Sequence, residues 1–135
     1  MNWMRTRLTI RAWVELVLYD ARIALGGFRS IQRSLKKQRV SAGHPGQTTG
    51  IVCTAVDLAA CLYVKPVHCL QRSTVTVRML RQNGIAASLA IAYRPAPFFA
   101  HAYVEVDGRI VNDSPAYAEQ LTVLYRQTPV RKDNE

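Results

Sequence analysis

The stretch that decides the fold is residues 69–113, CLQRSTVTVRMLRQNGIAASLAIAYRPAPFFAHAYVEVDGRIVND. Its first part predicts a helix that begins at Cys69 and ends near Gly84, a residue type suited to a helix C-terminus. Three apolar residues of this helix are available to a core: Leu70, Val77 and Leu80. We therefore expect a helix with a cysteine at its N-terminus.

After Gly84 the pattern changes from helical to extended. Residues 87–94 (ASLAIAYR) predict a strand, 94–99 (RPAPFF) a loop, and 101–113 (HAYVEV-DG-RIVND) a hairpin. Residues 121–126 (LTVLYR) could add a last strand. Helices followed by a small antiparallel sheet are typical of the α+β class.

The chain before this stretch predicts further helices. Apolar residues at helical spacing indicate an amphipathic helix over about 8–25, ended by Gly26-Gly27, and a second, basic helix follows it. Residues 41–50 are expected to form a loop, and a helix over 51–63 is stopped by Pro66. Helices therefore occupy most of the chain before residue 69.

Positive charge is concentrated at the start of the chain. The formal net charge is +9, and nine of the 18 Lys and Arg residues lie within the first 40 positions. We divide the chain into a basic helical arm, residues 1–45, packed on the core or on a partner, and a core of residues 46–135. A basic arm can attract nucleic acid, an anionic membrane or an acidic protein, or it can be the solvated face of a helix. Because no nucleic-acid-binding motif accompanies the charge, we expect no DNA or RNA partner.

We expect neither a targeting segment nor a transmembrane segment. Arg11, Glu15 and Asp20 interrupt the apolar residues near the N-terminus, which argues against both a signal peptide and a membrane span. The three cysteines are an odd number in a chain with no export signal. The expected location is the reducing cytoplasm, with at least one free thiol.

Cys69 is the candidate nucleophile. At the start of a helix, unpaired backbone N–H groups and the helix dipole stabilise a thiolate, and the same groups can bind an oxyanion. The alternative is a small apolar filler, which is our interpretation of Cys53 and Cys61 inside the preceding helix. These cysteines and His68 lack the spacing of a zinc site, so no metal is expected.

His101 and Asp113 are the candidates for a general base and its orienting carboxylate. A two-residue turn at Asp107-Gly108 would point Asp113 to the other face of the hairpin. A three-residue loop instead pairs Glu105 with Arg109 and sets His101 opposite Asp113. We predict this second register because it joins opposite charges and the two candidate residues. The alternative is a surface histidine beside an acidic turn.

The order of a cysteine at a helix start, a histidine on a strand and an aspartate at the end of the next resembles the transglutaminase-like core, a relative of papain. Within that superfamily the chain looks like the leader peptidases of lasso-peptide biosynthesis, a family that includes the C-terminal domain of the microcin-processing protein. The match is carried by CLQRS (69–73), LRQNGIAASLAIAY (80–93) and PFFAHAYVEVDGRIVNDSP (97–115). It covers about residues 51–115, roughly half of the chain.

The resemblance implies roles for single residues. Cys69 would be the nucleophile, His101 the general base and acid, and Asp113 the residue that orients the histidine. Candidates for oxyanion or substrate contacts are Leu70, Gln71 and Tyr103. Family members often have proline where Gln71 stands and tryptophan where Tyr103 stands.

The resemblance also implies a substrate and partners. The substrate would be the leader of a ribosomally made lasso precursor, presented by a small winged-helix leader-recognition protein. A separate ATP-dependent lasso cyclase would use the freed amine. The peptidase itself is expected to need no cofactor, although the resemblance leaves a dependence on ATP open. Two alternatives remain: a transglutaminase-type acyltransferase with the same triad, and a non-catalytic adaptor that binds leader and partner.

Overall fold

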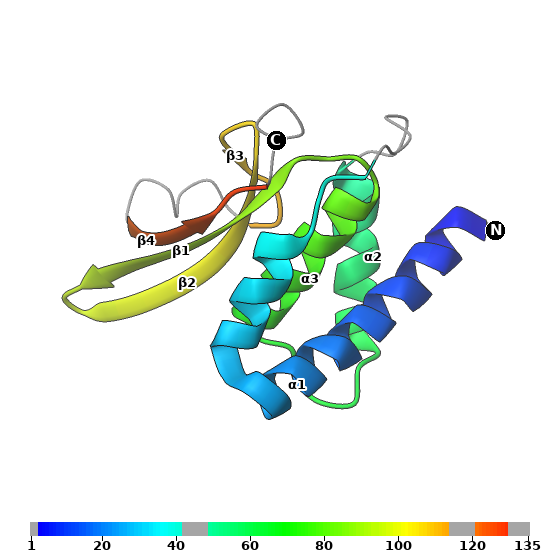
Figure 1. Ribbon diagram of the computed structural model, residues 1–135, viewed down its shortest axis with the longest axis horizontal. Helices are drawn as coiled ribbons and strands as arrows, with labels where there is room; N and C mark the ends of the chain where they lie inside the picture. Colours follow the sequence, from blue (N-terminus) through cyan, green and yellow to red (C-terminus); the bar gives the residue numbers. More distant parts are fainter. Residues whose placement is uncertain (1–2, 42–48, 114–120, 130–135) are drawn as a thin grey trace.

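The computed structural model describes residues 3–41, 49–113 and 121–129. Three helices precede a four-stranded antiparallel sheet, which confirms the predicted α+β class (Figure 1). The elements are α1 (Trp3–Lys37), α2 (Thr49–Cys61), α3 (Cys69–Gln82), β1 (Ala87–Pro95), β2 (Phe98–Val106), β3 (Arg109–Ile110) and β4 (Thr122–Gln127). The predicted domain boundary at 45/46 and most of the predicted loop at 41–50 lie outside the described residues.

Helix α1 is two helices joined at a bend. Gly27 has φ 64° and ψ −160°, a left-handed region that glycine enters without a steric penalty. The predicted break at Gly26-Gly27 is therefore confirmed. Both halves bury apolar side chains against the rest of the molecule, namely Leu8, Ala12, Leu16 and Tyr19 before the bend and Ile31 and Leu35 after it.

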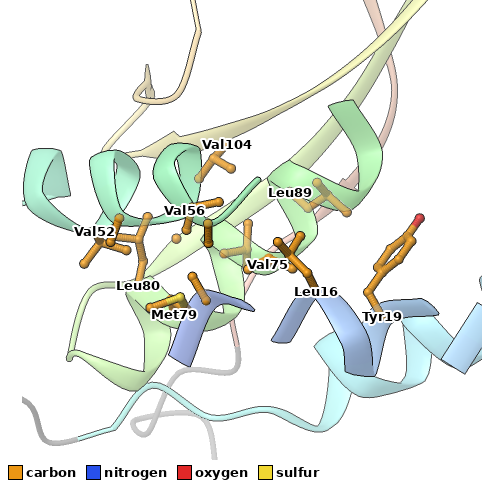
Figure 2. Close-up of a cluster of buried hydrophobic side chains, with 14 of the residues drawn as sticks. Leu16, Tyr19, Val52, Val56, Val75, Met79, Leu80, Leu89 and Val104 are labelled. Carbon is orange, nitrogen blue, oxygen red and sulfur yellow. The ribbon is translucent and has the colours of Figure 1, made fainter. Parts of the chain in front are cut away.

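One hydrophobic cluster joins the three helices to the sheet. Figure 2 shows Leu16 of α1 close to Val75 of α3, with Leu89 and Val104 contributed by the sheet. A fully buried Leu or Val stabilises a fold by roughly 1.5–3 kcal/mol, so α1 contributes substantially to this core. Within the described residues, no helix combines the length and the apolar composition needed to cross a bilayer.

The strand order is β3-β2-β1-β4. Residues Leu89 and Val104 face the helices, whereas Ala90 and Tyr103 lie in a smaller cluster on the opposite face. Pairing between β1 and β2 continues as far as Pro95 and Phe98, so the predicted loop at 94–99 is wrong except at its centre. This long hairpin extends beyond the helices (Figure 1).

The predicted register of the next hairpin is also wrong. Val106 pairs with Arg109, so the turn has two residues, Asp107 and Gly108, with φ 52° and 76°. Two positive φ angles give a turn whose twist matches that of the flanking strands, and Asp-Gly supplies them at little cost. Glu105 pairs its charge with Arg126 of β4 instead of Arg109, at 2.8 Å between Oε1 and Nε.

Candidate active site

Cys69 is the first residue of α3, as predicted. His68 before it is extended, with φ −89° and ψ 170°, and its side chain makes no capping hydrogen bond. The thiol therefore lies beside the first turn of a helix, where backbone N–H groups lack partners within the helix. Cys69 is partly exposed and packs against the main hydrophobic cluster. All three cysteines are free thiols.

His101 and Asp113 form a hydrogen bond, although the hairpin does not have the register that was predicted to place them opposite each other. His101 Nε2 lies 2.6 Å from Asp113 Oδ2, and the two side chains are 12% and 21% exposed. Strand β3 ends at Ile110, so the alternation of faces that would have turned Asp113 away does not continue. The Val111 N–H still donates to the Val104 carbonyl at 2.9 Å, and the chain leaves the ladder after it.

Asn112 is the residue that ends the ladder. Its side-chain Oδ1 accepts a hydrogen bond from the Val104 N–H at 2.9 Å, replacing a backbone carbonyl. Its Nδ2 donates to Ser73 Oγ at 3.0 Å, and Ser73 Oγ in turn donates to the Ala102 carbonyl at 3.1 Å. These bonds tie the segment after β3 to both α3 and β2. They thereby set the position from which Asp113 reaches His101.

The same bonds bring the start of α3 to the edge of β2. Ser73 lies one helical turn after Cys69, and Ala102 is the neighbour of His101. His101 itself lies on the face of β2 that carries Tyr103, with ring centroids 6.4 Å apart, and not on the face covered by the helices. From this face the imidazole would approach the thiol around the edge of β2.

Arg72 is a residue of this site that the sequence analysis missed. Its Nη2 lies 3.5 Å from Asp113 Oδ2 and its Nη1 lies 3.8 Å from Asp57 Oδ1. Its Nε is buried and has no hydrogen-bond partner among the residues that the structure describes. Asp113 thus lies between the imidazole of His101 and a guanidinium from α3. The sequence feature that could have indicated Arg72 is its place in CLQRS, within one helical turn of Cys69.

The three remaining candidates, Leu70, Gln71 and Tyr103, are buried or partly buried. Leu70 is partly buried and packs against the main cluster. Gln71 is 5% exposed, and its Nε2 donates to the Leu16 carbonyl at 3.1 Å. Tyr103 is 1% exposed, and burial, with the charge of Glu105 second, raises the pKa of its hydroxyl. The side chains of Gln71 and Tyr103 therefore belong to the interior, and the backbone N–H groups at the start of α3, including that of Leu70, are candidates for an oxyanion contact.

Cys53 behaves as a buried thiol. Its Sγ donates to the Val111 carbonyl at 3.6 Å. Burial first, and then the charge of Asp57, raises its pKa to about 11. Cys61 is exposed at the end of α2. Among the described residues no cluster of three or more His, Cys, Asp or Glu could hold a metal ion.

A comparison with protein families gives the class of this protein. The model of the transglutaminase-like superfamily matches residues 12–126, and the chain belongs to that superfamily. The matched region includes most of the predicted basic arm. No solved structure matches the chain.

A more particular similarity is to the microcin J25-processing protein McjB of Escherichia coli. The two are 39% identical over 56 residues, which are 42% of this chain and 27% of McjB. The chain thus matches about a quarter of that relative. The predicted resemblance to the transglutaminase-like and microcin-processing proteins is confirmed.

Proposed function

We propose that this protein is a cysteine peptidase that removes the leader from a ribosomally made lasso-peptide precursor. The proposal rests chiefly on the His101–Asp113 hydrogen bond beside a helix that begins with Cys69. The similarity to a microcin-processing protein supports the class of substrate. Cys69 is the nucleophile, His101 the base and acid, and Asp113 the residue that orients the imidazole.

The reaction proceeds through a thioester. With Nε2–H donated to Asp113, Nδ1 of His101 takes the proton of the Cys69 thiol, and the thiolate attacks the carbonyl carbon at the end of the leader. Backbone N–H groups in the first turn of α3 stabilise the oxyanion. His101 then gives its proton to the leaving amine of the core peptide as the C–N bond breaks. Water hydrolyses the thioester, which frees the leader carboxylate and the thiol.

The partners follow from the same proposal. A small winged-helix protein presents the leader, and an ATP-dependent cyclase joins the freed amine to a side-chain carboxylate. Hydrolysis through a thioester needs no metal or cofactor. The reaction takes place in the cytoplasm, where the three free cysteines stay reduced.

The test is mass spectrometry of a lasso precursor incubated with this protein and the leader-binding partner. Wild type is compared with Cys69→Ala and with Cys61→Ala, which removes an exposed thiol of α2 as a matched control. A leader fragment with a free carboxylate, formed by wild type and Cys61→Ala only, supports the proposal. A leader fragment whose terminal carbonyl is joined to an amine, and not to a hydroxyl from water, would instead establish the acyltransferase. Uncut precursor in every sample, with the partner bound, would contradict catalysis and favour the adaptor.

A further inference from the structure

The bend in α1 borders an open, basic hollow on the surface. Because Gly27 turns the second half of the helix back, Arg22 before the bend and Arg33 and Lys37 after it line one hollow of about 510 Å³. Arg78 of α3 lines the same hollow. A second hollow of about 380 Å³ shares Arg33 and adds two more cations, Arg29 and Lys36. The two hollows together form a basic track, defined by these six residues.

Among the described residues, an ion pair with Glu15 involves the track. Glu15, which is 1% exposed, holds Arg78 at 3.0 Å between Oε2 and Nε. Arg22 is crowded: burial first, and then the charge of Arg78, lowers the pKa of its guanidinium. Cations that repel one another in a partly desolvated hollow are stabilised by an added anion.

The shape of the track favours a chain over a compact anion. Its cations extend from Arg29 to Lys37 along the helix, a rise of about 12 Å, which an extended peptide covers with three or four residues. Neutral polar side chains between the cations, among them Ser30 and Gln32, are suited to hydrogen bonds with a peptide backbone. A single phosphate would contact only part of such a surface.

We propose that the basic track binds an acidic segment of a peptide. The inference rests on the proposed function, because the peptide would be the precursor that is cleaved at Cys69. Cys69 and Arg78 lie nine residues apart on α3, a rise of about 14 Å along the helix, which about four extended residues of a peptide would span. The track would then contribute to substrate choice at a distance from the reacting atoms.

The test measures binding without cleavage. A fluorescein-labelled peptide of alternating Glu and Ser is titrated with Cys69→Ala protein by fluorescence anisotropy at low salt. Into this protein Arg33→Gln and Lys37→Gln are introduced together, and Arg5→Gln with Arg7→Gln forms a matched control of equal charge loss on exposed positions of the same helix. We expect roughly tenfold weaker binding for the first pair, about two surface ion pairs, and nearly unchanged binding for the control.

Several results would overturn the proposal. They are equal weakening by both double variants, equally tight binding of a Gln-Ser peptide, and displacement of the peptide by tighter-binding duplex DNA on the same residues. Cleavage is measured separately with the Cys69-containing proteins. Specific binding without cleavage would contradict the proposed peptidase alone, whereas cleavage without any effect of the Arg33 and Lys37 substitutions on binding would contradict the track alone.

Discussion

Alkylation of the three cysteines offers a test of the active site that needs no substrate. The protein is treated with iodoacetamide near pH 8, and the modified fraction of each cysteine is followed by peptide mass spectrometry. Only the thiolate reacts, so each rate reports how strongly its surroundings favour that form. Cys61, which is exposed, serves as the internal reference.

The expected rate at Cys53 can be worked out from its environment. A pKa of about 11, against the ordinary value of 9.0, lowers the thiolate fraction near pH 8 by about two orders of magnitude. Partial burial and the hydrogen bond to the Val111 carbonyl restrict access further. Cys53 should therefore react at least about a hundredfold more slowly than an unperturbed exposed thiol.

The decisive rate is that of Cys69. If the imidazole reaches the thiol around the edge of β2, Cys69 reacts faster than Cys61, and His101→Gln slows it about tenfold or more without changing Cys61. Asp113→Asn should give a smaller loss, because the imidazole stays in place but loses the carboxylate charge 2.6 Å from its Nε2. An unchanged rate at Cys69 in the His101→Gln protein would refute the coupling of thiol and base, and with it the proposed mechanism.

Three further predictions concern the support of the site and the core. Arg72→Gln should lower kcat of precursor cleavage about five- to thirtyfold with little change in KM, since the part-exposed pair with Asp113 is worth about 1–2 kcal/mol after screening, and Arg72→Lys should recover part of it. A change in KM alone would contradict that positioning role. Arg81→Met should cost about 2–4 kcal/mol in urea unfolding, because the buried guanidinium donates to three backbone carbonyls, those of Leu35, Ala87 and Gln127. An unfolding free energy of Arg81→Met within experimental error of wild type would refute this stabilising role of Arg81. For Cys53, the raised pKa means that the unfolded state loses the thiol proton first as the pH rises. The contribution of the neutral thiol to the free energy of unfolding is therefore complete below about pH 9 and is lost towards pH 11. After allowance for the partial exposure of Cys53, that contribution is about 1–2 kcal/mol. Cys53→Ala should flatten this part of the alkaline decline in the urea midpoint, and an identical decline in both proteins would contradict the assignment.

The interaction of Asp113 with His101 was predictable from the sequence, whereas the backbone register around it was not. The sequence pattern correctly associated the two residues, but by a register that the structure does not adopt. The preference of Asp-Gly for a two-residue turn favoured the shorter loop. The side-chain oxygen of Asn112, in place of a backbone carbonyl, then accepted the hydrogen bond from the Val104 N–H. Backbone pairing rules assume that a strand continues, and they do not predict where a side chain will end it.

What the sequence by itself determined are the features that depend on neighbours along the chain. Helical spacing, the bend at Gly27, the start of α3 at Cys69 and the order of helices before strands all follow from local backbone preference and periodicity. Only the tertiary structure decided that Gln71 turns inward to α1, that Arg72 lies beside Asp113, and that His101 shares the face of β2 that carries Tyr103. Those outcomes depend on which distant surfaces pack together, and burial of the shared core, not any local pattern, selects that packing.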